Sequence, residues 1–392
     1  MIKTADIIIV GGGIMGASIA YALTSQKAGR VVLLERRALS TGTTGHSGAI
    51  IRQHYSNDVT IQMAQESLHV FEQFDDIVGG ECGFVRTGLL VLSGQQDVDA
   101  LKANVERQQR LGVNTKIIHS SEIDEIAPGY QYEDAAIACY EADTGVADPI
   151  ATTYAFADRA REQGAIIQEG VTVTKLLVDH DRVIGVETTQ ETILAPKIIL
   201  VANVWSASLV QPLGLTLPVK ATRHPMLVLR RPPDKNGQTS HHAVCFDEIQ
   251  HIYMRPDHQD VTLIGSLLNE EEENNPDNYM QGLSQDEGDA LRAAGEKRFP
   301  VLRQAVMRGG WAGIYDDSPD HHPILGRLSA YDGLYCAVGF SGHGFKMSPC
   351  TSRWVAHLVL TGETPQGMEY FAFERFAQGK EIHSGLSSGV LG

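Results

Sequence analysis

Three glycines near the N-terminus, Gly11, Gly13 and Gly16, have the spacing G-x-G-x-x-G. Glycines at this spacing serve a tight turn, a close approach of backbone to a pyrophosphate, and close packing of a helix on a strand. Glu35 follows Gly16 by nineteen residues, where a carboxylate accepts hydrogen bonds from the hydroxyl groups of an adenosine ribose. This combination predicts dinucleotide binding, and the motif alone fits FAD and NAD equally well.

The residues around these glycines predict the elements that position them. Residues 7–10 form a short apolar run, typical of a strand that is buried on both faces of a parallel sheet. Apolar residues then recur at helical spacing from Ile19 to Leu23, and RVVLLE at 30–35 predicts a second buried strand. This order places a pyrophosphate at a helix N-terminus, where free N–H groups favour negative charge.

A second glycine cluster, GFSGHGFKMSP, lies near the C-terminus at residues 339–349. Glycines gathered in this way indicate that the backbone turns through positive φ or passes very close to another group. GLYCAVGF, which overlaps the start of the cluster, predicts a buried strand, and a helix is expected to follow with Ser341 as its N-cap. The cluster also carries His343 and Lys346.

Length and composition limit the class of protein. With 392 residues, the chain exceeds the roughly 250–300 residues at which a single core stops growing, so two packed domains are expected. A net charge of −16 without a block of basic residues argues against a nucleic-acid partner. Five widely spaced cysteines favour reduced thiols and a cytoplasmic location. The apolar N-terminal stretch contains four glycines and no preceding basic region, so neither a signal peptide nor a membrane span is expected.

Three stretches together resemble the D-amino-acid-oxidase-like family of FAD enzymes. They are the N-terminal motif at 5–37, TGTTGHSGAIIRQHYSND at 41–58, and residues 308–359, which include GWAGIYDDSPDHHPILG and GFSGHGFKMSP. The resemblance covers essentially the whole chain and is nearest to the sarcosine oxidase and glycine oxidase branch, including the flavin-carrying β subunits of heterotetrameric sarcosine oxidases. It implies that the dinucleotide is FAD.

The resemblance implies an α/β fold with two domains. A Rossmann-like FAD-binding domain would be discontinuous and comprise residues 1–80, 140–215 and 316–392. An α+β substrate-binding domain would comprise residues 81–139 and 216–315. Short apolar runs in the second domain, such as HPMLVLRR and DVTLIGSLL, are typical of the strands of an antiparallel sheet.

The same resemblance implies which residues contact the cofactor. In this family the backbone at Gly339, Gly342 and Gly344 passes against the isoalloxazine ring. The expected cofactor-binding residues are Gly11, Gly13, Ile14, Met15, Gly16, Glu35, Arg36, Thr44, His46, Ser47, Val171, Ala202, Asn203, Trp205, Gly313, Gly339, Gly342, His343, Gly344, Phe345 and Lys346. Monomeric sarcosine oxidases attach FAD through a cysteine near the position of Gly313, so FAD is expected here to bind non-covalently.

Five residues are expected to act on the substrate, namely Lys346, Arg52, Tyr315, Tyr253 and His46. Lys346 and Arg52 would hold the carboxylate of an amino acid, since a guanidinium group grips a carboxylate through two parallel hydrogen bonds. Binding of Arg52 to the cofactor or to nearby backbone is an equal alternative, and Lys346 would otherwise be a surface lysine. Tyr315 matches a family position at the substrate pocket, whereas Tyr253 would either reach that pocket or pack within the sheet. His46 would act as a base only if the reaction needs one.

The implied reaction is oxidation of the C–N bond of a small primary or N-substituted amino acid. Hydride would pass to flavin N5 and give an imine that hydrolyses, and O2 or another acceptor would take the electrons. Two departures leave substrate and acceptor open: DVTLIGSLL lacks the lysine that helps monomeric sarcosine oxidases react with oxygen, and Ala49 replaces an active-site arginine. The alternatives are oxidation of a 2-hydroxy acid, and a β-type subunit of a multi-subunit amine oxidase or dehydrogenase. Homo-oligomers and partner subunits both remain open.

Asp320, His321 and His322 are the residues that most suggest a metal site. Adjacent residues on an extended segment point to opposite faces, and no further ligand set accompanies them in the sequence. No metal is therefore expected.

Overall fold

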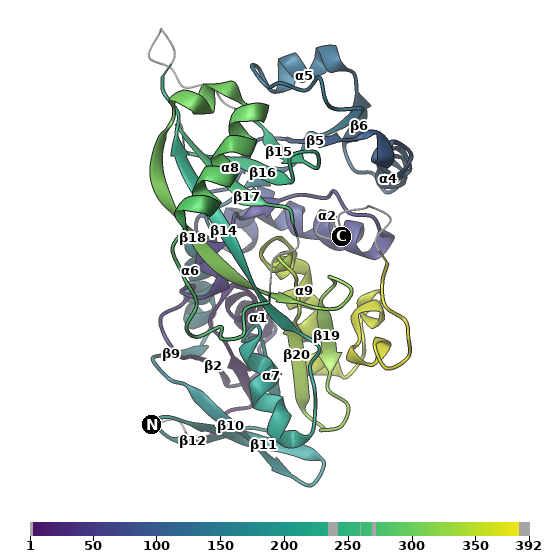
Figure 1. Ribbon diagram of the computed structural model, residues 1–392. Helices are drawn as coiled ribbons and strands as arrows, with labels where there is room; N and C mark the ends of the chain where they lie inside the picture. Colours follow the sequence, from purple (N-terminus) through teal and green to yellow (C-terminus); the bar gives the residue numbers. More distant parts are fainter. Residues whose placement is uncertain (1–2, 234–241, 259, 269–271, 384–392) are drawn as a thin grey trace.

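The computed structural model of the chain describes residues 3–233, 242–258, 260–268 and 272–383. Figure 1 shows two large sheets, one in the lower half of the view and one in the upper half. The end of the predicted FAD-binding domain, at 384–392, lies outside the described residues. Among the described helices, none combines the length and the apolar character that crossing a membrane requires.

In the described part of the chain, six strands form a sheet in the order β19-β20-β13-β1-β2-β9. Neighbouring strands are parallel except β19 and β20, and we call this the parallel sheet. Its strands are β1 (Ile7–Val10), β2 (Val31–Glu35), β9 (Ile166–Glu169), β13 (Ile198–Leu200), β19 (Ile324–Arg327) and β20 (Leu334–Val338). The strands predicted at both ends of the chain are confirmed, while the domain boundaries stay a prediction.

Both faces of the parallel sheet are covered, as its apolar strands require. Ile7 and Ile9 of β1 belong to one core, and Ile8 and Val10 belong to the core on the other side. The first core contains the helices α1 (Ile14–Ser25), α2 (Asp58–Glu72), α6 (Pro149–Glu162) and α9 (Gly344–Thr361). The second contains α7 (Trp205–Val210) and the small sheet of β10 (Val173–Asp179), β11 (Arg182–Thr188) and β12 (Thr192–Leu194).

Eight strands of the described chain form the large sheet, in the order β18-β14-β17-β16-β15-β5-β7-β6. They are β5 (Leu89–Ser93), β6 (Thr115–Ile118), β7 (Ile137–Glu141), β14 (Lys220–Arg230), β15 (Val244–Asp247), β16 (Ile252–Asp257), β17 (Val261–Ser266) and β18 (Val306–Asp317). The predicted antiparallel sheet is confirmed, with one correction: β5 and β15 are parallel. These strands lie far apart in the sequence, so no hairpin turn dictates their direction.

Helices cover the two faces of the large sheet. α8 (Gln285–Arg298) and α5 (Ser120–Ile126) share one core with Ile264, whereas α4 (Val98–Arg110) shares the other with Phe246. The remaining elements are short: α3 (Phe74–Ile77), β3 (Ile50–Ile51), β4 (Val85–Arg86), β8 (Gly145–Val146), η1 (Thr43–His46), η2 (Gln95–Asp97), η3 (Gln211–Leu213), η4 (Pro300–Gln304), η5 (Met368–Phe371) and η6 (Phe373–Arg375).

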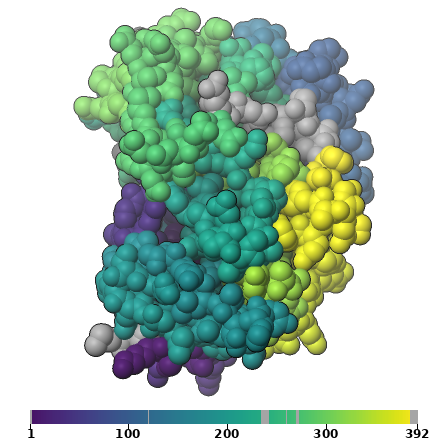
Figure 2. Space-filling view, turned by 60° about the horizontal axis from the view of Figure 1, so that its bottom comes forward, coloured from purple at the N-terminus to yellow at the C-terminus, as the bar shows by residue number. Residues whose placement is uncertain are grey.

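The C-terminal segment is held by a buried ion pair. Arg375 of η6 donates to both carboxylate oxygens of Asp320, each at 2.8 Å. Figure 2 shows this segment in yellow, lying along the right edge of the molecule. Asp320, which the sequence brings next to two histidines, therefore has a structural partner. The described residues contain no cluster of side chains suited to a metal ion.

The start of α9 differs from the prediction. The helix begins at Gly344, and its N-cap is His343 rather than Ser341. Ser341 has a φ of +50°, and its hydroxyl group accepts a hydrogen bond from the backbone N–H of Ser318 at 3.1 Å. The serine hydroxyl thus fixes the end of β18 against the glycine cluster instead of capping the helix.

We predict that Gly16→Ala destabilises the fold and lowers cofactor content. A Cβ atom on Gly16 would lie 1.9 Å from the carbonyl oxygen of Gly11, so α1 would have to move away from β1. Overpacking of this kind costs about 1–3 kcal/mol. Urea unfolding measures the loss, with Gly282→Ala as control because nothing lies within 4 Å of the added atom. Equal stability of the two variants would contradict the prediction.

Candidate functional site

The turn between β1 and α1 lines one end of a cavity. Gly11 has a φ of +118°, and a Cβ atom there would lie 2.7 Å from the carbonyl oxygen of Val201. Gly13 is the N-cap of α1, and a Cβ atom on it would lie 2.9 Å from the hydroxyl oxygen of Thr44. The Thr44 hydroxyl accepts the Ile14 N–H at 3.1 Å. Only glycine fits these positions, so the backbone at the helix N-terminus is open to a ligand.

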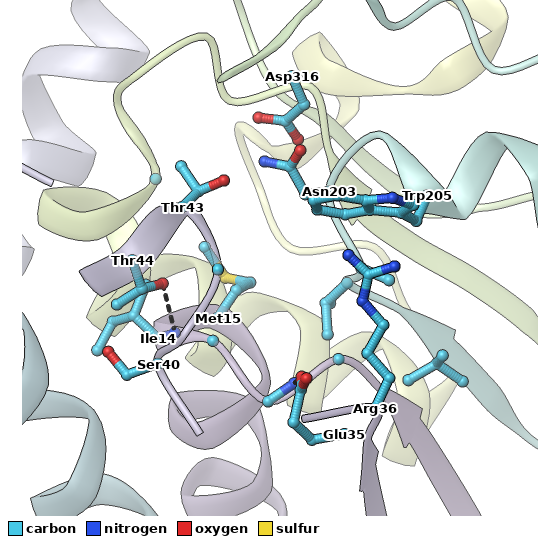
Figure 3. A pocket seen from close by; sticks show the side chains of 18 of the residues that line it. Ile14, Met15, Glu35, Arg36, Ser40, Thr43, Thr44, Asn203, Trp205 and Asp316 are labelled. Carbon is cyan, nitrogen blue, oxygen red and sulfur yellow. Dashed lines mark hydrogen bonds between the residues drawn. The ribbon is translucent and has the colours of Figure 1, made fainter. Parts of the chain in front are cut away.

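A cavity of about 340 Å³ extends from this turn along the carboxyl ends of β1 and β2. Figure 3 shows its polar side chains, with Glu35 and Arg36 at one end and Asn203 beside Asp316 at the other. The predicted cofactor-binding residues that line it are Gly11, Gly13, Ile14, Met15, Glu35, Arg36, Thr44, Ser47, Val171, Ala202, Asn203, Trp205, Gly342, Gly344 and Phe345. The polar and aromatic lining residues that the sequence prediction missed are Arg37, Ser40, Thr43, Thr172, Ser208, Asp277, Asp316 and Phe340.

The residues present fit a dinucleotide. The N-terminus of α1 points to the cavity and offers N–H groups and a favourable dipole to a pyrophosphate. Glu35 ends β2, and its carboxylate accepts the N–H of Gly12 at 2.7 Å and the N–H of Arg37 at 2.8 Å. These bonds hold the carboxylate at the cavity edge, where a ribose hydroxyl group can donate to it.

An aspartate from a distant segment joins the Glu35 end of the cavity. Asp277 accepts hydrogen bonds from the Arg36 guanidinium at 2.6 Å and from the Trp205 indole at 2.9 Å. Arg36 in turn lies over the Trp205 ring, 4.1 Å from its centroid. No motif marks Asp277 in the sequence, because its partners are 241 and 72 residues away.

Asp316 is a buried carboxyl group on the cavity wall. Burial raises its pKa to about 7, although the N–H of Gly339, which donates to it at 2.6 Å, acts in the opposite direction. Because Gly339 has a φ of +71°, this bond fixes an unusual backbone turn just before α9. The role of Gly339 is therefore to shape the loop, since Gly339 does not line either cavity in the described chain.

A second cavity of about 70 Å³ adjoins the first. Ser47, Tyr315, Gly342 and Phe345 line both, so the two cavities share a wall. The other residues of the smaller cavity come from the segment after η1, from α9 and from the large sheet: Gly48, Ala49, Ile50, Arg52, Phe246, Tyr253, Leu267, Ser341, His343 and Lys346. Four of the five predicted substrate-binding residues thus meet in one place.

Arg52 and Lys346 bring two buried cationic groups to the small cavity. Arg52 lies over the Tyr55 ring, 4.1 Å from its centroid, and donates to the carbonyl group of His54. Burial lowers the pKa of Lys346 well below its usual value, and the positive charge of Arg52 lowers it further. Among the described residues, no carboxylate lies within ion-pair distance of the Lys346 ammonium group. A cavity of this charge favours an anionic ligand.

Of the histidines His46, His54 and His343, one lines the small cavity and two do not. His343 lines it, and its Nδ1 atom lies 3.2 Å from the Tyr55 hydroxyl group. His46, predicted to bind the cofactor and to act on the substrate, lines neither cavity of the described chain, because its ring turns back to the Gly42 carbonyl group at 2.9 Å. His54 is buried between Asn104 and Gln108, and burial lowers its pKa to about 3.

Two further predicted glycines serve packing rather than the cavity wall. Gly16 lies against Gly11, and Gly313 of β18 lies against His46, where a Cβ atom would come within 2.9 Å of the histidine Cβ. Neither lines the dinucleotide cavity or the adjoining small cavity. Gly313 therefore allows η1 to approach the large sheet closely.

A dinucleotide cavity joined to a small cationic cavity is what a redox enzyme with an acidic substrate requires. The chain matches the family model described as FAD dependent oxidoreductase (DAO) over residues 6–358, and it belongs to this family of amino acid and amine oxidases and dehydrogenases. The predicted resemblance is confirmed.

Three relatives show how far the similarity extends. Sarcosine oxidase subunit beta of Arthrobacter sp is 28% identical over 387 residues, which cover 97% of this chain and 93% of that protein. Mitochondrial sarcosine dehydrogenase of Homo sapiens is 25% identical over 95% of this chain, and the chain spans 42% of its length. The crystal structure of L-proline dehydrogenase from P. horikoshii has a TM-score of 0.89 at 27% identity and covers 97% of this chain and 99% of that one.

We predict that Asp316→Asn raises the free energy of unfolding relative to wild type. The difference between the two proteins grows as pH rises from about 4 to about 7. A folded-state pKa of about 7 means that the native protein binds a proton which the unfolded chain releases near its ordinary value of 3.8. The contribution of Asp316 to the stability of the wild type therefore falls as pH rises through this window, by up to about 4 kcal/mol, and is constant above it. The asparagine oxygen still accepts the Gly339 N–H.

Urea unfolding between pH 4 and 9, at matched FAD content, measures this difference. Asp289→Asn is the control, because Asp289 is exposed on α8. A constant stability difference between Asp316→Asn and wild type over this range would contradict the raised pKa.

Proposed function

We propose that this protein oxidises the C–N bond of a small primary or secondary amino acid with FAD as a non-covalent cofactor. One observation carries the proposal: the pair of buried cations, Arg52 and Lys346, lies in a small cavity that shares a wall with the dinucleotide cavity. A carboxylate bound there would offset the cost of burying the Lys346 charge. The atoms next to that carboxylate would then face the cofactor.

The size of the cavity and the named substrates of the relatives support a small amino acid. The relatives named above include a sarcosine dehydrogenase and an L-proline dehydrogenase. Sarcosine and proline are both secondary amino acids with a carboxylate one carbon from the nitrogen. Phe246 and Leu267 close the small cavity on the side of the large sheet and leave little space for a long side chain.

The residues of this chain bind and orient the substrate. Arg52 and Lys346 hold its carboxylate, and their positive charge lowers the pKa of the bound amine, which favours the neutral form that can release hydride. FAD, when bound, accepts the hydride. Tyr315 lies at the boundary between the cavities, and Phe246 and Phe345 give the small cavity apolar walls. The imine product then hydrolyses.

Non-covalent binding of FAD is supported by the positions of the cysteines. All five are buried, and none lines either cavity in the described part of the chain. Precipitation with acid would release FAD into the supernatant. Flavin that stays with the precipitated protein would contradict this part of the proposal.

A second candidate is the same chemistry within a larger assembly. The match to sarcosine oxidase subunit beta covers nearly the full length of both chains, and that relative is one subunit of its enzyme. Partner chains would then take the electrons, whereas an independent oxidase would pass them to O2. Purification from the native source with the chain as bait would reveal partners.

The first test is an anaerobic visible spectrum of the FAD-loaded protein. Sarcosine, glycine, proline, longer N-alkyl amino acids and matched 2-hydroxy acids are added in turn. Bleaching of the flavin band by an amine supports the proposal and names the substrate class, and readmission of air then tests O2 as acceptor. Bleaching by hydroxy acids alone would replace C–N with C–O oxidation.

We predict that Lys346→Met weakens binding of a carboxylate ligand by about 10- to 150-fold. A hydrogen bond to a charged group contributes about 1.5–3 kcal/mol, and the methionine keeps much of the side-chain volume. Acetate and the substrate from the screen are titrated by the change in the flavin spectrum. Lys102→Met, which changes an exposed lysine on α4, is the control. Wild-type affinity in Lys346→Met would show that the carboxylate binds elsewhere.

A further inference from the structure

Tyr315 occupies the junction of the two cavities and is tightly packed. Its ring lies against the backbone of Gly342, where an added Cβ atom would be 2.5 Å from a ring carbon. His224 stacks on the ring, with centroids 3.8 Å apart and an interplanar angle of 19°. Besides the effect of burial, the hydroxyl groups of Tyr315 and Tyr253 influence each other electrostatically: Tyr315 raises the pKa of Tyr253, and Tyr253 acts to lower the pKa of Tyr315. The plane of the Tyr315 ring is thus fixed by Gly342 and His224.

His224 is itself held in a defined orientation. Its Nε2 atom lies 3.0 Å from the hydroxyl oxygen of Thr222, and that hydroxyl group donates to Asp317 at 2.6 Å. A hydroxyl group has one proton, so with Asp317 ionised and accepting that proton, the histidine is the donor in its contact with Thr222. This chain of bonds places the proton on Nε2 and stops rotation of the imidazole ring.

The chain of bonds follows from strand pairing between β14 and β18. Thr222 is directly opposite Tyr315 in the register, and Lys220 is opposite Asp317. Thr222 and His224 are two residues apart and therefore lie on the same face of β14. Gly313, opposite His224, contributes no side chain, and the imidazole lies over the neighbouring Tyr315.

The stacked imidazole is neutral. Burial lowers the pKa of His224 to about 3, and the charge of His321 acts in the same direction. Asp317, His321 and the Tyr315 hydroxyl are the titratable groups that face this region. A neutral ring adds no third positive charge beside the cavity that holds Arg52 and Lys346.

We propose that His224 is a positioning residue for Tyr315, and that its hydrogen-bonded ring sets the plane of Tyr315 where the cofactor and substrate cavities meet. His224 lines neither cavity of the described chain, so it acts through Tyr315. The inference rests on the proposed function insofar as the small cavity is the substrate site. It assigns to β14 a role in substrate binding that the sequence motifs do not mark.

The functional test compares His224→Ala, His224→Phe and His224→Asn in the FAD-loaded protein. Loss of the stacked ring lowers kcat/KM for the best amino acid by about 3- to 10-fold in the alanine and asparagine variants, the range expected from the energy of an aromatic pair. Phenylalanine keeps the stacked ring but not the hydrogen bond to Thr222, so it restores part of the loss. FAD content and the affinity for acetate are measured in parallel, with His69→Ala on α2 as an exposed control.

A double-mutant cycle then asks whether His224 acts through Tyr315. In a Tyr315→Leu background, His224→Ala produces no further loss in kcat/KM or in acetate affinity. An additional loss of the full size in that background would overturn the proposal, as would wild-type kcat/KM in His224→Ala.

A spectroscopic readout separates this proposal from the proposed function. Protein labelled with 3-fluorotyrosine gives a ¹⁹F resonance for Tyr315, which is assigned by its absence from Tyr315→Phe. The ring current of His224 shifts that resonance, so it moves in His224→Ala and stays closer to its wild-type position in His224→Phe. An unmoved resonance in His224→Ala overturns the positioning role. If no amino acid bleaches the flavin of the wild type, the proposed function fails, and the ¹⁹F resonance still tests whether His224 stacks on Tyr315.

Discussion

The contact between Gly16 and the carbonyl group of Gly11 sets how closely α1 approaches the parallel sheet. α1 is also the helix against which α6 and α9 pack within the same core. The position of α9 in turn places Gly344 at the cofactor cavity and Lys346 at the small cavity. A backbone contact between two glycines thus determines where an ammonium group lies more than three hundred residues later. A side chain at either glycine would push α1 away from the parallel sheet. The helix α9, which packs on α1, would then no longer hold Gly344 and Lys346 at the two cavities.

The charge distribution supports a ligand site at this junction. The chain carries a net charge of −16, yet the interior beside the dinucleotide cavity holds a guanidinium and an ammonium group. Burying a cation is costly unless an anion or a set of hydrogen bonds accompanies it. The depressed pKa of Lys346 expresses that cost in the folded protein, and an anionic ligand would relieve it. The buried charge at this junction therefore lowers the stability of the ligand-free protein and favours binding of an anionic ligand.

Features that depend on local spacing could be predicted from the sequence, whereas features made by distant partners could not. The strand at 7–10, the glycine turn and the place of Glu35 follow from periodicity and short-range geometry. Asp277 contacts Arg36 through a loop from the other part of the chain, and no pattern within either segment records that pairing. The ring of His46 turns to the Gly42 carbonyl group, and a residue type near a motif does not fix the direction of its ring. The N-cap of α9 was misassigned because the Ser341 hydroxyl is engaged by β18.

Substrate choice and family membership depend on different parts of the molecule. The N-terminal glycine motif lies on the parallel sheet and the C-terminal one at the start of α9, and the dinucleotide imposes the spacing of the first. Phe246, Tyr253 and Leu267 come from or directly follow strands of the large sheet, where a change of one methylene group in the pocket alters selectivity by only about 1–3 kcal/mol and leaves the fold intact. Tyr315 links the part of the molecule that selects the substrate to the part that binds the cofactor, because it belongs to β18 of the large sheet and lines both cavities. A substitution in the large sheet can therefore alter the cofactor cavity through the residues that contact Tyr315.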